Sequence, residues 1–166
     1  MKTRLMKKED ISKIANAFLK QGWDGRHEVL ERYWLDQQNK IRYVFVAELD
    51  EDIAGYVTVA KKVKHGPFQE SELPEITDFN VFEQYREKGI GNSLLDAAEN
   101  KAVQFSTIVT LGVGLHSGYG AAQRIYAKRG YLPDGSGVWF ENKNIDNGEV
   151  CMNNDDLCIY LSKKLR

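Results

Sequence analysis

The stretch Arg86-Glu87-Lys88-Gly89-Ile90-Gly91 decides the fold of this chain, because it joins two segments of different periodicity. The segment before it, Ile76–Val81, is extended and apolar, whereas Ile90–Phe105 has the spacing of an amphipathic helix. A strand, a tight turn and a helix are therefore predicted in succession. Such a turn directs unpaired backbone N–H groups and the positive end of the helix dipole at one point, which favours an anion such as a phosphate. The two glycines leave room for the anion, and the two basic residues add positive charge at the rim.

The segments on both sides of this turn resemble the acetyl-CoA-binding core of the GNAT family of N-acetyltransferases. They read Glu75-Ile-Thr-Asp-Phe-Asn-Val81 and Tyr85-Arg-Glu-Lys-Gly-Ile-Gly-Asn-Ser-Leu-Leu95. The family signature, Arg/Gln-x-x-Gly-x-Gly/Ala, is filled by Arg86, Gly89 and Gly91. A second family segment, Ala-x-x-x-Tyr-x-x-x-Gly-Phe/Tyr, is similar to Ala122-Gln-Arg-Ile-Tyr126-Ala-Lys-Arg-Gly130-Tyr131. The detailed resemblance covers residues 75–131, and the coarse order of elements fits the whole chain.

The composition is that of an ordinary globular protein. The chain has 166 residues, 42% of them hydrophobic and 28% charged, so one domain over residues 1–166 with a buried core is expected. The 23 basic and 24 acidic side chains nearly cancel, which argues against nucleic acid as a partner. No segment approaches the roughly 20 apolar residues of a membrane helix, and the charged N-terminus lacks a signal-peptide core. We therefore expect a cytoplasmic protein without a membrane partner.

The two cysteines, Cys151 and Cys158, make neither a disulfide framework nor a zinc site. We expect two small side chains in or near a strand, and no bound metal. Because neither cysteine lies in the two family segments, no residue indicates an acyl-enzyme intermediate.

Periodicity and turn residues predict an α/β (α+β) fold with a mixed, mostly antiparallel central sheet and flanking helices. The Asp50-Glu51-Asp52 break makes the strands around it an antiparallel hairpin. Loops are expected from His65 to Pro74 and over Asn142–Asp156. The predicted elements in chain order are the strand Thr3–Met6, a helix over residues 11–19 that Gly22 ends, the helix His27–Gln38, the strands Ile41–Leu49, Ile53–Val63 and Glu75–Val81, the helix Ile90–Phe105, the strand Thr107–Val113, the helix Gly118–Arg129, and the strands Val138–Phe140 and Leu157–Ser162. This order is the one that a GNAT-like acyl-CoA acyltransferase fold implies.

The resemblance implies an N-acetyltransferase with acetyl-CoA as its cosubstrate. In the family, the strand before the turn separates from its neighbour, and its exposed backbone pairs with the pantetheine arm. The N–H group at the position of Val81 polarises the thioester carbonyl. The residues that match the coenzyme-binding positions are Phe79, Asn80, Val81, Arg86, Glu87, Lys88, Gly89, Ile90, Gly91 and Asn92. The family often has a coenzyme-contacting asparagine three residues before the helix alanine, but here Tyr119 takes that position, and His116 or Ser117 could replace the contact.

A group must also accept the proton of the attacking amine. Glu75 is the first candidate, because it lies eleven residues before Arg86, the spacing of the catalytic glutamate in the histone-modifying branch of the family. Asp78 is the second candidate. Strand alternation places Glu75 and Asp78 on opposite faces, so we do not expect both to face the substrate. The alternatives are His116, since an imidazole titrates near physiological pH, and an ordered water.

Tyr126 matches the family tyrosine that stands near the coenzyme sulfur and can protonate the departing thiolate. A phenol has an ordinary pKa of about 10 and can serve as such a donor only if the site raises the basicity of the thiolate. The alternative interpretation is a core tyrosine, because Tyr119, Ala122 and Tyr126 are neighbours at helical spacing.

The candidates for acceptor binding are Glu28, Tyr33, Trp34, Trp139, Trp23 and Asp24, and we favour the last two. They lie between Gly22 and Gly25 in a predicted loop, where nothing forces the tryptophan into the core. An aromatic ring beside a carboxylate suits a cationic amine. The predicted acceptor is therefore a primary amine of a small molecule or a peptide.

The sequence is also compatible with other functions. A Rossmann dinucleotide site is disfavoured, because Leu94 stands where the third glycine would be. A non-catalytic acyl-CoA-binding sensor or regulatory module of the same fold is the main alternative. A longer acyl chain or an alcohol acceptor is a further one. Since the family often forms dimers, a homodimer is one expected assembly.

Overall fold

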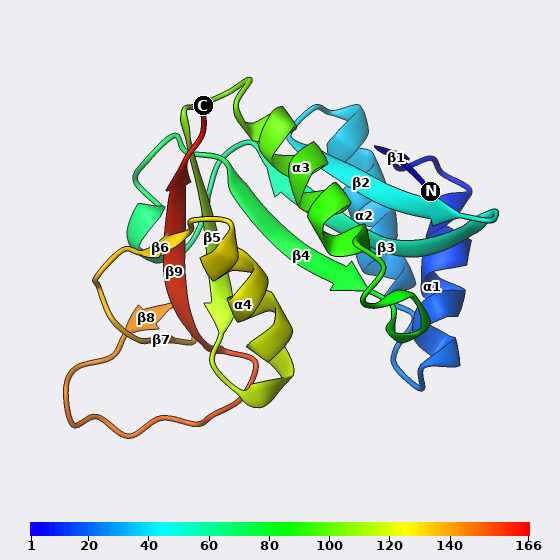
Figure 1. Ribbon diagram of the computed structural model, residues 1–166. Coiled ribbons are helices and arrows are strands. Elements are labelled where there is room, and N and C mark those ends of the chain that lie inside the picture. Colours follow the sequence, from blue (N-terminus) through cyan, green and yellow to red (C-terminus); the bar gives the residue numbers. More distant parts are fainter.

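The computed structural model describes all residues from Met1 to Arg166 (Figure 1). The strands are β1 (Lys2–Leu5), β2 (Arg42–Leu49), β3 (Asp52–Ala60), β4 (Glu75–Val81), β5 (Ile108–Gly114), β6 (Leu132–Pro133), β7 (Trp139–Phe140), β8 (Lys143–Asn144) and β9 (Leu157–Lys164). The α-helices are α1 (Asp10–Lys20), α2 (His27–Gln38), α3 (Ile90–Ala102) and α4 (Gly120–Lys128). Three short 3₁₀ turns lie at Gly66–Phe68, Glu83–Tyr85 and Ser117–Tyr119.

The strands form one mixed sheet in the order β1-β2-β3-β4-β5-β9-β7-β8, with β6 beside β9. All pairs are antiparallel except β4 with β5, which run parallel. The predicted fold class, a mixed and mostly antiparallel sheet with flanking helices, is confirmed. None of the helices has the length and apolar character needed to cross a bilayer.

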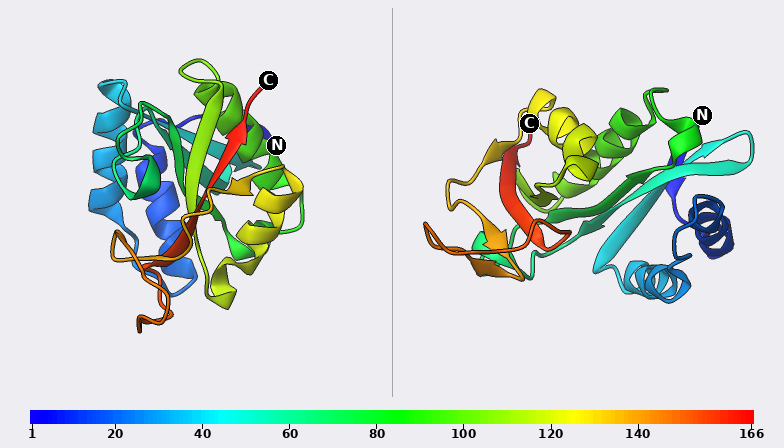
Figure 2. Two further views of the ribbon diagram at one scale, coloured as in Figure 1. Left: turned by 90° about the vertical axis from the view of Figure 1, so that its left-hand side faces the viewer. Right: turned by 90° about the horizontal axis from the view of Figure 1, so that it is seen from below.

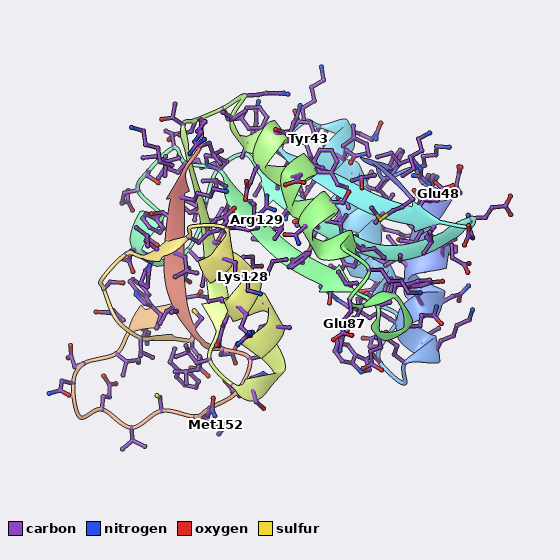
Figure 3. The ribbon with its side chains drawn as sticks, in the orientation of Figure 1. Tyr43, Glu48, Glu87, Lys128, Arg129 and Met152 are labelled. Atoms are coloured by element: carbon purple, nitrogen blue, oxygen red, sulfur yellow. The ribbon has the colours of Figure 1, made fainter.

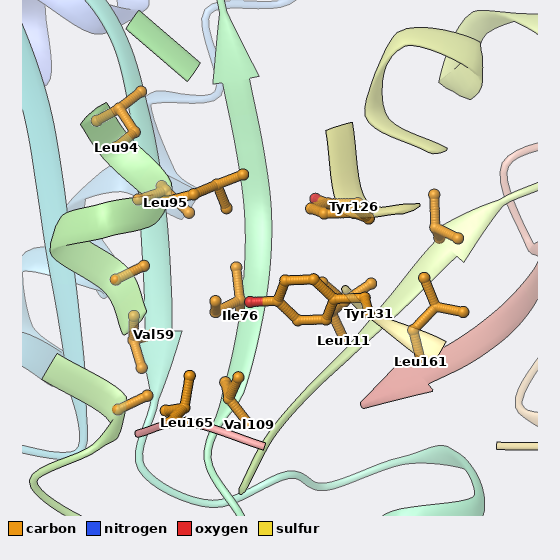
Figure 4. Packing of buried hydrophobic residues seen from close by; sticks show 14 of the residues in the cluster. Val59, Ile76, Leu94, Leu95, Val109, Leu111, Tyr126, Tyr131, Leu161 and Leu165 are labelled. Atoms are coloured by element: carbon orange, nitrogen blue, oxygen red, sulfur yellow. The ribbon is translucent and has the colours of Figure 1, made fainter. Parts of the chain in front are cut away.

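Helices cover both faces of the sheet, as the view from below shows: α1 and α2 lie on one face, and α3 and α4 on the other (Figure 2). The α3–α4 face holds the larger core cluster, which includes Ile76, Leu94 and Leu111 (Figure 4). A second cluster under α1 and α2 contains Phe18, Leu30 and Tyr56. The sheet is therefore a central layer with a hydrophobic core on each side.

The strands β4 and β5 separate near the middle of the sheet. Their ladder contains only the pairs Glu75↔Thr110 and Ile76↔Leu111, at the start of β4. Beyond Ile76 the two strands diverge, and they end well apart (Figure 1). The backbone of β4 after Ile76 consequently has a partner strand on one side only.

A β-bulge at Asp78 changes the faces of β4. The register pairs Tyr56 with Asn80 and Thr58 with Thr77, so two β4 residues, Asp78 and Phe79, face one residue of β3. Asp78 has a positive φ of 49°. Strict alternation predicts that Glu75 and Asp78 lie on opposite faces, and this prediction is wrong, because the extra residue shifts the alternation by one.

Because of the bulge, the polar and the apolar side chains of β4 from Thr77 to Val81 lie on opposite faces of the sheet. Phe79 and Val81 pack against the core cluster of α3 and α4. The polar side chains gather on the face of α1 and α2, where Thr77 meets Thr58 and Asp78 meets residues of α2 and β3. The polar residues of β4 on this face are Glu75, Thr77, Asp78 and Asn80.

The predicted bounds match the structure closely for α2 and β4, and differ at several ends. The helix α3 ends at Ala102 rather than Phe105, whose ring lies on Tyr43 at the surface, with 5.7 Å between centroids. The helix α4 begins at Gly120 rather than Gly118, because a 3₁₀ turn precedes it. The short strands β6 and β8 were not predicted, since two paired residues carry no periodic signal.

Candidate active site

The turn between β4 and α3 has the conformation of an anion-binding site. Glu87 and Gly89 have positive φ values of 63° and 76°. The first N–H group of the helix to donate to a backbone carbonyl is that of Ser93, which bonds to Gly89 at 3.2 Å. The N–H groups of residues 87–92 donate to no acceptor in the protein. These groups lie at the positive end of the α3 dipole, so they are free to bind an anion from outside.

The side chains of this turn leave its centre open. Arg86, Glu87 and Lys88 are exposed, and Figure 3 shows Glu87 on the loop that leads into α3. The Nε atom of Arg86 donates to the carbonyl of Val81 at 3.3 Å. A Cβ atom at Gly91 would lie 3.1 Å from the ring of Phe79, so glycine lets the turn lie against β4. The two glycines of the signature thus allow a left-handed turn and a close contact with β4, respectively.

The backbone N–H and carbonyl groups of Val81 point to the side of β4 that faces β5. The N–H of the next residue, Phe82, donates to the carbonyl of Ala54 in β3 at 3.0 Å. Because N–H groups alternate in direction along a strand, the N–H of Val81 points away from β3. The bond from Arg86 to the Val81 carbonyl lies on that same side. Val81 therefore presents an N–H group where β4 and β5 have separated.

Tyr126 projects from α4 toward the same region, beside Tyr131 (Figure 4). Its ring centroid lies 6.1 Å from that of Phe79. The side chain is 5% exposed, and burial raises the pKa of its phenol above the ordinary value. The hydroxyl of Tyr126 has no hydrogen-bond partner. The only fully buried side-chain polar atom without a partner is Nε of Arg42, so the Tyr126 hydroxyl is not fully buried. The Tyr126 hydroxyl is thus protonated, unpaired and accessible.

Glu75 lies on the opposite face of the sheet, at the start of β4. Burial raises the pKa of its carboxyl to about 7, although the nearby Arg42 guanidinium acts in the other direction. The carboxyl accepts no hydrogen bond within the protein, and it too is not enclosed. A carboxyl with these properties can exchange a proton near neutral pH.

Arg42 reaches across the sheet from β2 and lies under α2. Its Nη1 atom donates to the hydroxyls of Thr58 at 2.6 Å and Thr77 at 2.8 Å. Its Cζ atom lies 4.6 Å from the centroid of the Tyr33 ring. Arg42 is therefore a fixed positive charge beside Glu75, held by Thr58 of β3, Thr77 of β4 and the Tyr33 ring of α2.

Asp78, in contrast, is surrounded by hydrogen-bond donors. Arg26 forms a two-bond pair with it, with both N–O distances at 2.8 Å. The hydroxyl of Tyr33 donates to Oδ2 at 3.0 Å, and the amide of Asn80 donates to Oδ1 at 2.8 Å. Tyr33 is one of the predicted acceptor residues, but nothing in the sequence indicates that Arg26 or Arg42 belongs to this site, because only the folded chain brings them to β4.

His116 has both of its ring nitrogens in use. Nε2 lies 2.7 Å from Asp155 Oδ1, and Nδ1 accepts from the N–H of Gly118 at 3.0 Å. Tyr119 donates to the same Asp155 oxygen at 3.2 Å, and its ring packs edge-on to His116. These contacts fasten the long loop before β9 to the start of α4, so they give His116 and Tyr119 a structural role.

Trp23 and Asp24 lie in the loop between α1 and α2. Trp23 is 53% exposed and stacks on Phe18, with 6.2 Å between ring centroids. Asp24 accepts from the N–H of Arg26 at 3.1 Å and lines a cavity of about 430 Å³ between α1 and the start of α2. Neither Glu75 nor Tyr126 lines this cavity. Of the residues in and next to this loop, Arg26 reaches β4, whereas Trp23 and Asp24 do not contact it.

Comparison with known proteins identifies the family and the fold of this chain. The model of the acetyltransferase (GNAT) family matches residues 8–131. No curated protein sequence matches the chain at a significant level. The matched residues include both the turn before α3 and the helix α4 of this chain.

Solved structures show the same fold at low sequence identity. A GNAT-family protein from Desulfovibrio desulfuricans is 14% identical over 98% of each chain, with a TM-score of 0.72. A Salmonella typhimurium protein, solved with its cofactor acetyl-CoA, is 16% identical over 100% of this chain and 94% of its own, with a TM-score of 0.70. Ribosomal-protein-alanine N-acetyltransferase from Brucella melitensis is 17% identical over 99% of this chain and 100% of its own, with a TM-score of 0.69.

Proposed function

Because the chain belongs to the acetyltransferase (GNAT) family, we propose that it transfers the acetyl group of acetyl-CoA directly to a primary amine of a small molecule or a peptide. The row of unpaired N–H groups at residues 87–92, beside the point where β4 and β5 separate, carries this proposal. The turn provides a site for a pyrophosphate, and β4 provides an open strand edge next to it. These features fit the two parts of coenzyme A that need backbone donors.

The residues of the turn would hold the pyrophosphate of acetyl-CoA. The free N–H groups and the α3 dipole supply the attraction, and Arg86 and Lys88 add positive charge at the rim. Phe79, Asn80 and Val81 would receive the pantetheine arm along the open side of β4. Acetyl-CoA supplies the activated acetyl group, and the chain supplies binding, orientation and proton transfer.

Val81 would stabilise the charge that develops on the thioester oxygen. Its N–H points to the open side of β4, where the rings of Phe79 and Tyr126 lie with 6.1 Å between their centroids. A fixed donor at the developing oxyanion contributes about 10²–10³ in rate.

Glu75 would accept the proton that the amine loses as its nitrogen bonds to the acetyl carbon. We favour Glu75 over Asp78, because the Glu75 carboxyl is unpaired and its pKa of about 7 matches neutral conditions. Asp78 already accepts hydrogen bonds from Arg26, Tyr33 and Asn80, and protonation would weaken them. Glu75 and Val81 pair with Ala60 and Gly55, which are five residues apart on β3, so the proton would reach Glu75 along a chain of waters.

Tyr126 would donate its proton to the sulfur as the carbon–sulfur bond breaks. Burial keeps the phenol protonated, and the transfer becomes favourable because the same buried surroundings raise the basicity of the thiolate that forms beside it. The proton taken up by Glu75 and the proton given by Tyr126 balance the transfer, and exchange with solvent restores both groups.

Calorimetric titration of the purified protein with acetyl-CoA, beside NADH, tests the donor site. We expect acetyl-CoA to bind in the micromolar range and NADH not to bind. A screen of primary amines by thiol release then tests transfer, with Glu75→Gln as the inactive control. Binding of acetyl-CoA without release for any amine would favour a non-catalytic sensor, and no binding would overturn the donor site.

A further inference from the structure

Two residues with strained backbones, one in a loop and one in a strand, bind each other in this protein. Arg26 precedes α2 with φ at 56°, and Asp78 forms the bulge of β4 with φ at 49°. Neither is a glycine, so both adopt a conformation that L-residues seldom adopt. Their side chains form two parallel bonds of 2.8 Å each. The pair is mostly covered, since the Arg26 side chain is 30% exposed and that of Asp78 13%.

Further hydrogen bonds attach this pair to α2, to β3 and to a second residue of β4. Tyr33 from α2 and Asn80 from β4 both donate to Asp78. Arg26 also donates to the hydroxyl of Tyr56 in β3, at 2.8 Å. The left-handed conformation of Asp78 is therefore held from α2, β3, β4 and the loop before α2. Strained backbone persists only where the surroundings impose it in this way.

The bulge determines where the backbone of Val81 points. With the bulge, Phe82 donates to β3 and the N–H of Val81 faces the open side of β4. Without the extra residue at Asp78, the register with β3 would shift by one, and each later residue would turn to the other side. The N–H of Val81 would then face β3, where it could not reach a ligand.

We propose that Arg26 and Asp78 are positioning residues, whose pair holds the bulge and thereby aims the Val81 N–H at the carbonyl of the acyl donor. This role rests on the proposed function, since it assigns a ligand to that N–H. It differs from the role of a base, because it requires the conformation of residue 78 rather than its carboxylate. It also joins the loop between α1 and α2 to the donor site through one ion pair.

Two substitutions at one position separate conformation from charge. Asp78→Ala and Asp78→Gly both remove the carboxylate and release Arg26, but only glycine adopts a positive φ without strain. The readout is the ratio of the affinities for acetyl-CoA and free coenzyme A, measured by calorimetry. Free coenzyme A has no acetyl carbonyl, so the ratio reports the bond from Val81, whereas the turn at residues 87–92 binds both ligands.

We expect the natural protein to prefer acetyl-CoA by on the order of fivefold, as one hydrogen bond would give. Asp78→Ala should bring this ratio close to one, and Asp78→Gly should keep most of it. Arg26→Met should lower the ratio as well, because it leaves the left-handed Asp78 unpaired. Affinity for free coenzyme A should stay within about twofold in all three variants, as expected when a distant site is unchanged.

A spectroscopic measurement checks the same bond directly. With acetyl-CoA labelled at the carbonyl carbon, the ¹³C resonance should move on binding to the natural protein and to Asp78→Gly, and less on binding to Asp78→Ala. An equal ratio and an equal resonance in the alanine and glycine variants would overturn the proposal, whether both kept the preference or both lost it. Equal affinity of the natural protein for the two ligands would overturn it too. Absence of any coenzyme binding is a separate result, which would remove the proposed function and this inference together.

Discussion

The rings of Tyr126 and Phe79 meet at the point where β4 and β5 part, with 6.1 Å between their centroids and 47° between their planes. One ring belongs to α4 and the other to β4, so the two halves of the candidate donor site touch through this pair. Only Tyr126 carries a hydroxyl, and that hydroxyl has no partner within the protein. Its removal should therefore affect chemistry much more than folding.

We expect Tyr126→Phe to lower kcat by about 10²-fold, at the low end of the range for a general acid. Affinity for acetyl-CoA and the melting temperature should change little, because the substitution breaks no hydrogen bond. Tyr131→Phe is the matched control, since its hydroxyl donates to Glu99 at 3.0 Å. That variant should keep its turnover and lose about 1 kcal/mol of folding stability. Unchanged kcat in Tyr126→Phe would assign Tyr126 to the core alone.

The pH dependence of transfer should follow Glu75. Its pKa of about 7 means that the basic form increases as pH rises through 7, so kcat/KM should rise there. Arg42→Met should move the midpoint to higher pH, because the lost guanidinium favours the ionised carboxyl. The control is Arg32→Met, which removes an exposed arginine from α2. A midpoint that stays in place in Arg42→Met would mean that another group controls the profile.

Folding stability should also report the protonation of Glu75. The pKa of its carboxyl is about 7 in the folded protein and near the ordinary 4.5 in the unfolded chain. The folded state therefore binds the proton more tightly, and this contribution is complete below pH 4.5 and is lost as pH rises through 7. We expect Glu75→Gln to be more stable than the natural protein by about 1–3 kcal/mol at pH 8. Denaturant unfolding at pH 5 and pH 8 measures this, and a pH-independent difference would contradict it.

A single added charge tests the phosphate site. Asn92→Asp is nearly isosteric, keeps an oxygen for the bond from Arg129, and places a carboxylate in the first turn of α3. It should reduce affinity for acetyl-CoA by about tenfold through repulsion, while the helix dipole slightly favours folding. Asn100→Asp makes the same change near the other end of α3 and should leave affinity unchanged. Equal affinities in both variants at low salt would place the pyrophosphate elsewhere.

Local patterns in the sequence predict the main elements and the turn that decides the fold. The bounds of α2 and β4 follow from periodicity, and the glycines at 89 and 91 identify the turn before α3. The bulge at Asp78 could not be predicted, because the contacts of Asp78 are with residues distant in sequence, such as Arg26, which is 52 residues away. For the same reason, Arg42 could not be assigned to the site. Alternation alone therefore placed Asp78 on the wrong face of β4 relative to Glu75.

The early parting of β4 and β5 has a mechanical consequence. Two residue pairs, Glu75↔Thr110 and Ile76↔Leu111, make up the ladder between the two parts of the sheet. A sheet joined at one end and open at the other has the build of a hinge. A ligand bound between the open ends of β4 and β5 would contact both parts of the sheet and restrict their relative motion. Hydrogen exchange should therefore be slower in both β4 and β5 when coenzyme is bound.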